Sequence, residues 1–420
     1  MRGVQKGLKI VINIKFSFAF FQKSLFLCEN VLYNKSIKRK DVAFMKYRHI
    51  EKLGIDISAF GLGCMRLPMM KDEDGKDVVD EKKWVDIIRR CIDGGVNYLD
   101  TAYVYTGGLN EKYVGLALRD GYREKVYLAT KLPLWDCDSK EYMYKTFEEQ
   151  LTRLETDYID FYLIHCLTGE KWKKMKELGV CGFLDDLKAK GKIKYACFSF
   201  HDNFDAFETI INEYPWDMCQ LQFNYMDIEN QAGLRGVKLA GEKAVPVVVM
   251  EGLLGGKLAN VPSEVKEHFE RANPDFSPVE WAFRWLCNFP QIATVLSGVA
   301  TMEQAEDNLE IFDRCDIGIM SESELEVVAQ AREIYKKRIK VDCTGCEYCM
   351  PCPAGVEIPR IFARWNYTYM YGIKDNSYKK LVDENKDASQ CVSCRACMDK
   401  CPQGFDIPEK LKEAHEYFKT

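Results

Sequence analysis

The chain has 420 residues, of which 47% are hydrophobic, enough for one large core and a small second domain. Its net charge of −5 argues against the broad basic face that nucleic-acid binding requires, and no apolar run reaches membrane-spanning length. We therefore expect two folded domains that bind neither nucleic acid nor a membrane.

Residues 1–44 differ from the rest in charge: nine Lys or Arg against two acidic residues contribute +7, which leaves −12 for the remainder. The largely apolar stretch 11–21 would suit a signal peptide or an amphipathic surface anchor, but Lys15 interrupts it and no small-residue cleavage site follows. Our preferred hypothesis is that the native protein begins at Met45 and that residues 1–44 translate upstream sequence, since Lys38-Arg39-Lys40-Asp41 can be encoded by a purine-rich ribosome-binding site.

From Met45 onward, short β-rich runs alternate with amphipathic stretches such as Glu81–Asp93, Glu141–Leu154 and Phe204–Asn212, which predict helices. Eight strands over about 260 residues favour a TIM (β/α)8 barrel, and no G-x-G-x-x-G follows the first strand to indicate a Rossmann domain. The predicted strands are Ala59–Cys64, Tyr98–Thr101, Val126–Thr130, Phe161–His165, Tyr195–Ser199, Met218–Leu221, Val247–Met250 and Ile292–Leu296.

A (β/α)8 barrel places its chemistry at the C-terminal ends of its strands. The ionisable residues expected there are Asp100 and Tyr105 after the second strand, Lys131 after the third and His165 at the close of the fourth. Singly, each has an ordinary structural interpretation: a helix cap, a wall of the core, a solvated charge and a hydrogen-bonded core histidine. Together they indicate a catalytic group, in which Tyr103 is the rival to Tyr105.

A carbonyl that accepts hydride develops oxyanion charge, which a proton donor must neutralise. Tyrosine, with an ordinary pKa of about 10, is a poor donor at neutral pH. We expect Lys131 to lower the pKa of Tyr105, Asp100 to fix the lysine, and a neutral His165 to donate a hydrogen bond to the carbonyl oxygen. Candidates for the wall of the substrate pocket are Trp135, Tyr225 and Arg66.

These residues also carry a resemblance to the aldo-keto reductase family, which extends over about Lys46 to Arg332. The D-T-A-x-x-Y spacing of that family selects Tyr105 over Tyr103 as the acid. The resemblance implies an NAD(P)H-dependent reductase that converts a small aldehyde or ketone to an alcohol. Its motifs are D-T-A-Y-V-Y at 100–105, A-T-K at 129–131, L-I-H at 163–165 and the openings M-K-Y-R-H-I-E-K-L-G at 45–54 and G-L-G-C-M-R-L-P at 61–68.

The resemblance further implies a nicotinamide-nucleotide site, although Phe200 departs from the family's Ser-Asn pair. Gln220 would face the nicotinamide amide, Met250 takes the place of a ring-stacking aromatic, and the glycine-rich turn can present N–H groups to the diphosphate. Gln304 stands where many relatives have an arginine for the 2′-phosphate, so NADP and NAD stay open, with NADP preferred as in the family. The implied cofactor residues are Ser199, Gln220, Met250, Gly252, Leu253, Gly255, Lys257, Ser297, Gln304 and Asn308.

Two copies of one cysteine pattern end the chain, and each closes on a Cys-Pro pair. The copies also match beyond the cysteines, since C-P-A-G-V-E-I-P at 352–359 parallels C-P-Q-G-F-D-I-P at 401–408. Two quartets of soft ligands predict two cubane 4Fe-4S clusters. Structural zinc is the alternative, but zinc sites usually split into two C-x-x-C pairs a dozen or more residues apart. The eight cysteines are Cys343, Cys346, Cys349, Cys352, Cys391, Cys394, Cys397 and Cys401.

The second run has the spacing of a bacterial ferredoxin, whereas the first has one residue fewer before its last cysteine. In two-cluster ferredoxins the fourth cysteine of each run ligates the other cluster. We therefore expect Cys401 to join the first three cysteines of the first run, and Cys352 to join the first three of the second. The aromatic stretch 362–371 between the runs predicts a helix, so the module is expected to be mainly helical.

The expected organisation is an extension over 1–44, a barrel over 45–338 and a ferredoxin-like dicluster domain over 339–420. The ten other cysteines show no paired spacing, which indicates a reducing, cytoplasmic location. Hydride transfer moves two electrons and a cubane cluster moves one, so direct exchange normally requires a flavin or radical intermediary, and no flavin signature is visible.

Three functional hypotheses follow. The preferred one is a carbonyl reductase whose clusters transfer electrons, dock a redox partner protein or stabilise the fold. The second is an electron-transfer or redox-sensing iron-sulfur protein on a reductase scaffold. The third is a cluster-stabilised barrel whose tail serves oligomerisation.

Overall fold

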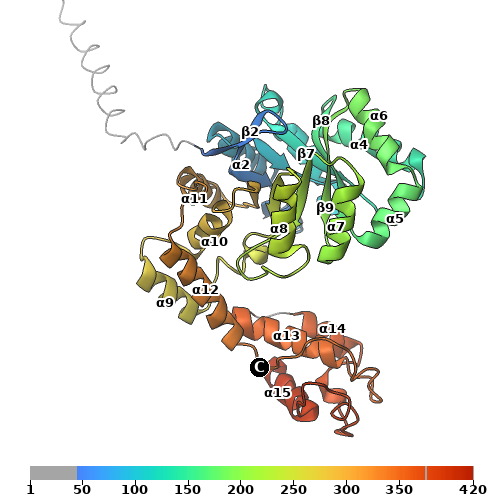
Figure 1. Cartoon of the computed structure of the whole chain (residues 1–420), viewed down its shortest axis with the longest axis vertical. Helices are drawn as coiled ribbons and strands as arrows, with labels where there is room; N and C mark the ends of the chain where they lie inside the picture. Colours follow the sequence, from blue (N-terminus) through green and yellow to red (C-terminus); the bar gives the residue numbers. More distant parts are fainter. Residues whose placement is uncertain (1–44, 374–375, 420) are drawn as a thin grey trace, which may run out of the picture. The chain divides into compact units, whose positions relative to one another are not determined.

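The computed structural model describes residues 45–373 and 376–419. The hypotheses about the N-terminal extension therefore lie outside the described residues. Eight parallel strands close into a barrel, and each strand lies beside its neighbour in the chain, with the last strand pairing with the first (Figure 1). The barrel strands are β3 (Phe60–Gly63), β6 (Tyr98–Asp100), β7 (Tyr127–Leu132), β8 (Ile159–Leu167), β9 (Ile193–Phe200), β10 (Met218–Gln222), β11 (Val247–Met250) and β12 (Ile292–Ser297).

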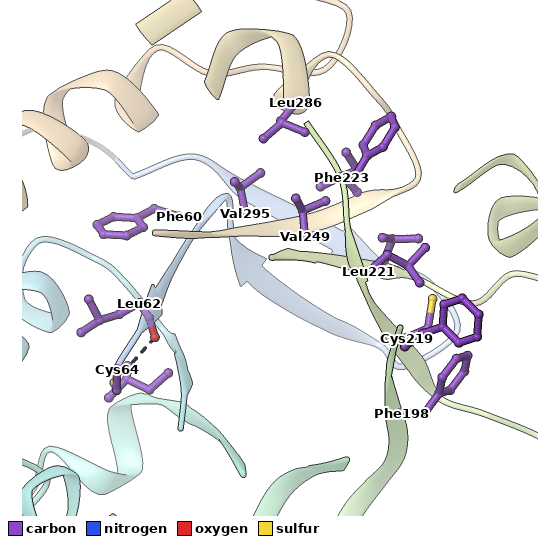
Figure 2. Packing of buried hydrophobic residues seen from close by; sticks show 14 of the residues in the cluster. Phe60, Leu62, Cys64, Phe198, Cys219, Leu221, Phe223, Val249, Leu286 and Val295 are labelled. Atoms are coloured by element: carbon purple, nitrogen blue, oxygen red, sulfur yellow. Dashed lines mark hydrogen bonds between the residues drawn. The ribbon is translucent and has the colours of Figure 1, made fainter. Parts of the chain in front are cut away.

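All eight predicted strands are thus confirmed, and β11 has the predicted bounds. Helices surround the strands and pack their apolar faces on the outward-pointing side chains. Leu286 of α10, for example, lies in one cluster with Val249 and Val295 of neighbouring strands (Figure 2). These helices are α2 (Glu81–Asp93), α3 (Asn110–Ala117), α4 (Lys140–Leu154), α5 (Gly169–Glu177), α6 (Val180–Ala189), α7 (Phe204–Glu213), α8 (Gly233–Glu242), α9 (Ser263–Ala272), α10 (Pro278–Cys287), α11 (Met302–Asp313) and α12 (Glu322–Lys337).

Helix starts follow from local chemistry. Asp80, Ser139 and Asn203 each accept a hydrogen bond from the third residue of α2, α4 and α7, satisfying a backbone N–H that has no partner within the helix. Within the part of the chain that the structure describes, the four short 3-10 helices are η1 (Tyr105–Gly108), η2 (Arg123–Lys125), η3 (Leu254–Gly256) and η4 (Ala388–Gln390).

Two antiparallel hairpins were not predicted: β1 (Tyr47–Ile50) with β2 (Ile55–Ser58), and β4 (Met69–Lys71) with β5 (Asp77–Val79). The first contributes Ile50 and Ile57 to a buried cluster with Tyr98, Phe161 and other side chains from the early positions of the barrel strands. Since this cluster fills the N-terminal end of the barrel, the polar groups described below lie toward the opposite end.

The segment after α12 is mainly helical, as predicted, with its own buried cluster around Phe362, Trp365 and Leu411. Cysteines of both runs pack against that cluster. None of the described helices is long and apolar enough to cross a membrane. The helices of this segment are α13 (Ile358–Tyr371), which matches the predicted aromatic helix, α14 (Ser377–Asp383) and α15 (Ile407–Lys419).

Candidate active site and cluster pockets

Asp100, Lys131 and Tyr105 meet at the C-terminal end of the barrel. Asp100 is the last residue of β6 and pairs with Ala129 of β7, so Lys131, two residues further on, points to the same face. Lys131 Nζ lies 2.6 Å from Asp100 Oδ1 and 3.2 Å from Tyr105 Oη. Lys131 and Asp100 are 1% and 3% exposed, so this ion pair is almost fully removed from water.

Tyr105 is the first residue of η1, and residues 101–104 connect it to β6. The loop is held in place because Thr101 Oγ1 donates to Asn110 Oδ1 and Asn110 Nδ2 donates to the Cys64 carbonyl oxygen, each at 2.6 Å. Tyr103 instead donates its hydroxyl to Glu149 at 2.7 Å. Tyr103 therefore faces α4, and the geometry favours Tyr105 as the residue paired with Lys131.

The pKa values differ from the sequence prediction in one respect. Burial raises the pKa of Tyr105, and the nearby Lys131 opposes this effect without overcoming it. Burial also works against the charge on Lys131, but Asp100 and Tyr105 outweigh it and raise the pKa of the ammonium. The predicted lowering of the Tyr105 pKa is therefore wrong for the protein without substrate. The physical reason is that burial of the phenol outweighs the attraction of Lys131, and the nearby Asp100 carboxylate also raises the pKa.

His165 lies in β8 beside Tyr105. The pairing of β8 with β9 shifts register between Ile164 and Leu167, and such an irregularity can re-aim a side chain at a strand end. The imidazole meets the ring of Tyr105 edge-on at 5.9 Å and that of Trp135 at 5.1 Å between centroids. Its Nδ1 is buried and has no hydrogen-bond partner among the described residues.

Burial and the nearby Lys131 lower the pKa of His165 to about 2, so the ring is neutral at physiological pH. Because an unfolded histidine has a pKa of about 6.5, the unfolded chain binds a proton below that pH that the folded protein does not bind. The free energy of unfolding should therefore fall as the pH falls, by about 2 kcal/mol through His165 between about pH 7 and 5. Urea denaturation at several pH values, with His165→Gln losing less stability than wild type over this range, tests the assignment.

His49→Gln is the control for this measurement. A hydrogen bond to Asp56 raises the pKa of that exposed imidazole, so its contribution has the opposite sign. An equal pH slope in wild type and His165→Gln would contradict the neutral, buried state of His165.

The residues predicted to bind nicotinamide lie on adjacent strands. Ser199 of β9 and Gln220 of β10 are register partners, and Met250 ends β11. Gln220 Nε2 donates to Asp100 Oδ2 at 3.3 Å, while its Oε1 is buried without a hydrogen-bond partner in residues 45–373 and 376–419. Gln220 therefore joins the Asp100–Lys131 pair to the expected nicotinamide position and has one acceptor left to satisfy.

The loop 252–257 follows β11. Gly255 has φ +66°, a conformation that favours glycine, and its carbonyl oxygen accepts a hydrogen bond from Arg66 Nη2 at 3.0 Å. The N–H of Leu254 donates to the carbonyl oxygen of Glu251, and the N–H of Lys257 donates to the carbonyl oxygen of Leu254. Any contact of Lys257 with a diphosphate must therefore come from its ammonium rather than its backbone N–H.

Gly252 and Leu253 begin this loop, and Gly252 has a packing role as well. A Cβ at Gly252 would lie only 2.8 Å from Leu286, so glycine lets the loop approach α10. Ser297 ends the next strand, β12, and its Oγ accepts a hydrogen bond from Asn308 Nδ2 of α11 at 2.9 Å. Gln304 is exposed, and its side-chain oxygen accepts from the N–H of Ala300 at 2.8 Å.

Two of the three candidates for the pocket wall lie elsewhere. Arg66 reaches the loop 252–257, and Tyr225 is fully buried against Phe269. Trp135 is 54% exposed and its ring lies beside His165, so its place in the pocket wall stays a prediction.

Lys171 lies near His165 and was not predicted from the sequence. Its Nζ donates to the carbonyl oxygen of Cys166, the residue after His165, at 3.0 Å and lies 5.5 Å from the ring centroid of Trp135. The one feature of the sequence that could have indicated Lys171 is its position three residues after Thr168, the N-cap residue of α5.

The cysteines line two cavities in the tail. Cys343, Cys346, Cys349 and Cys401 line the first, whose empty space, including the part open to solvent, is about 350 Å³. Cys352, Cys391, Cys394 and Cys397 line the second, whose empty space measured in the same way is about 310 Å³. Each cavity thus combines the first three cysteines of one run with the fourth cysteine of the other run. Among the described residues, no three His, Cys, Asp or Glu side chains are placed to hold a single metal ion.

A closed (β/α)8 barrel with a buried Asp-Lys-Tyr group at one end, followed by paired cysteine pockets, defines an oxidoreductase scaffold with an iron-sulfur module. The chain belongs to the Aldo/keto reductase family, whose model matches residues 59–326. The model of a 4Fe-4S dicluster domain matches residues 342–405.

Related proteins agree with this assignment. The chain is 30% identical over 301 residues to the uncharacterized oxidoreductase YqkF of Bacillus subtilis, covering 63% of this chain and 90% of that protein. Among solved structures, the holo form of aldo-keto reductase AKR11C1 from Bacillus halodurans is 26% identical, with a TM-score of 0.58 over 69% of this chain and 96% of that one. An aldo-keto reductase from Klebsiella pneumoniae in complex with NADPH, 21% identical, shares the fold with a TM-score of 0.54 over 68% and 95% of the two chains.

Proposed function

We propose that the protein reduces a small aldehyde or ketone to an alcohol with NAD(P)H. The observation that carries this proposal is the buried contact of Lys131 with both Asp100 and Tyr105. A buried ion pair is costly to form, so its position against a phenol at the catalytic end of a barrel favours a chemical role. The family of the barrel supports the same reaction class.

Each residue has a separate role in this proposal. The nicotinamide, when bound, supplies hydride to the carbonyl carbon. Tyr105 keeps its proton at neutral pH because burial raises its pKa, and it donates this proton to the carbonyl oxygen. Lys131 then stabilises the phenolate, Asp100 fixes Lys131, and neutral His165 orients the carbonyl oxygen through a ring N–H.

For the nucleotide we propose the predicted residues on β9 to β12 and their loops, with NADP preferred. Gln220 Oε1 fits a donor such as the nicotinamide amide, because it is buried without a partner. Arg66 and Lys257 place two cations at the loop 252–257, which suits phosphate groups. Gln304 offers no charge to a 2′-phosphate, and cations at the diphosphate serve NAD and NADP alike, so the preference for NADP rests on the family of the barrel.

For the tail we propose two 4Fe-4S clusters with the crossed ligation predicted above. The cavity linings support the pairing of Cys401 with the first run and of Cys352 with the second. Four sulfurs around a cavity suit a cluster in which each of four irons binds one thiolate. A single zinc ion would instead require all four sulfurs to lie about 2.3 Å from the metal. Such clusters supply one-electron chemistry when bound.

We also propose that the boundary between the barrel and the dicluster domain lies near residue 338 and that the protein is cytoplasmic. The described cysteines are all free, which suits a reducing compartment. The electron-transfer alternative has support of its own, because Cys346 and Cys394 are exposed. The clusters that they ligate would therefore lie near the surface, where a partner protein can exchange electrons with them.

An anaerobic screen of aldehydes and ketones with NADPH and NADH tests the proposed reaction. We expect oxidation of one nicotinamide that depends on the carbonyl compound and yields the alcohol. The absence of turnover with every carbonyl class, together with bleaching of the clusters by NADPH, would favour the electron-transfer alternative.

A further inference from the structure

Lys257 extends its ammonium from the loop 252–257 to the aromatic helix α13. Its Nζ lies 4.6 Å from the ring centroid of Tyr367 and 5.9 Å from that of Tyr371. The same Nζ lies 3.7 Å from the position that a Cβ on Gly255 would take. Because an aromatic face attracts a cation, Lys257 is held between the proposed diphosphate loop and α13.

The C-terminal half of α13 is anchored to the barrel. Tyr371 is buried in the main core cluster, where its ring lies 5.5 Å from that of Tyr335 in α12 and 5.3 Å from that of Tyr367. Arg338 Nε donates to the carbonyl oxygen of Tyr369 at 3.2 Å. These contacts fix the rings that face Lys257.

The N-terminal half of the same helix belongs to the cysteine pockets. Ile358 and Phe362 line the first cavity, and Ile358 lines the second as well. Tyr367 is five positions after Phe362, which corresponds to roughly 8 Å along a helix axis. The positive end of the helix dipole therefore lies at the pockets and its negative end near Lys257 and Arg338, whose charges favour this arrangement.

Resting on the proposed function, we propose that Lys257 and α13 link nucleotide binding in the barrel to the redox state of the cluster module, so that each event opposes the other. A bound diphosphate and an electron added to a cluster are both negative charges at opposite ends of one anchored helix. When phosphate groups pair with the Lys257 ammonium, they neutralise part of its positive charge. The added negative charge of a reduced cluster is then stabilised less. By reciprocity, cluster reduction weakens nucleotide binding by the same factor.

This linkage differs from hydride or electron exchange between the two sites. It requires only the one-electron reduction of a cluster by an external donor and the binding of an anion. Lys257 acts as a positioning residue, because its ammonium contacts both the loop 252–257 and the ring of Tyr367 but neither the reacting carbonyl nor the cluster. A carbonyl reductase built in this way would hold its nucleotide less tightly under strongly reducing conditions.

The test uses the full-length, cluster-loaded protein and the compound ADP-ribose 2′-phosphate. This ligand contains the diphosphate but has no nicotinamide to accept hydride. Its dissociation constant is measured anaerobically by calorimetry with the clusters oxidised and after reduction by dithionite. We expect the constant to be about fivefold larger after reduction. A saturating amount of this ligand should correspondingly lower the cluster midpoint potential by about 40 mV, from 59 mV per decade.

Lys257→Met and Tyr367→Leu should both bring the ratio of the two constants close to one, with iron content unchanged. Tyr369→Leu is the matched control, because that ring faces Lys340 at 3.6 Å, Arg338 at 5.5 Å and Tyr417 instead of Lys257. It should retain the fivefold ratio. A ratio of one in wild type, or an unchanged ratio in both variants, would overturn the linkage. If the wild type then still reduces carbonyls with NADPH, the proposed function stands, whereas failure to bind either nucleotide overturns both.

Discussion

Tyr105→Phe should lower kcat for carbonyl reduction by about 10²- to 10⁴-fold, the usual contribution of a positioned proton donor. The substitution removes only the hydroxyl that lies 3.2 Å from Lys131 Nζ. Since the ring and the ion pair remain, the dissociation constant for NADPH should stay within about twofold of wild type. Steady-state kinetics and a nucleotide fluorescence titration measure the two effects separately.

Tyr103→Phe is the matched control for this variant. It removes an equivalent hydroxyl two residues away, but one that donates to Glu149 of α4. We expect its kcat to stay within about twofold of wild type. Wild-type turnover in Tyr105→Phe, or a large loss in Tyr103→Phe, would contradict the assignment of the acid.

The crossed ligation of the clusters predicts different iron contents for two double variants. Cys346→Ala with Cys401→Ala removes two ligands of one pocket, so about four of eight irons should remain. Cys346→Ala with Cys352→Ala removes one ligand from each pocket, and little iron should remain. Iron and sulfide analysis after anaerobic purification, with electron paramagnetic resonance of the reduced protein, distinguishes the two.

If each run instead ligated its own cluster, these two results would be exchanged. Equal iron loss in both double variants would contradict both pairings. Zinc bound in place of iron in the anaerobically purified wild type would return the zinc alternative, so zinc is measured in the same samples.

The order of barrel strands could be read from the sequence because each strand is a short apolar run between amphipathic helices. Helix α2 has the predicted bounds, since Asp80 caps its start and Gly94 follows its end. The β1–β2 and β4–β5 hairpins were missed. The second is built largely from exposed or partly exposed residues, so burial leaves no alternating pattern to recognise.

The candidate site was predicted in composition but not in its electrostatics. Motif spacing selected Tyr105, and the structure places its hydroxyl against Lys131. The pKa of that phenol depends on how deeply it is buried and on how closely Asp100 neutralises the lysine. Both quantities arise from strands and loops brought together by folding, so no local pattern in the sequence contains them.

By itself, the sequence determined the kinds of chemistry that this protein can hold: eight cysteines in two repeated runs, and one acid, one amine, one phenol and one imidazole at the ends of successive strands. These follow from residue type and spacing, which are local. Only the tertiary structure decided that Arg66 reaches the loop 252–257 and that Lys257 rests on Tyr367. Such contacts join segments that lie about a hundred or more residues apart, and they exist only because packing of the barrel and of α13 brings the side chains together.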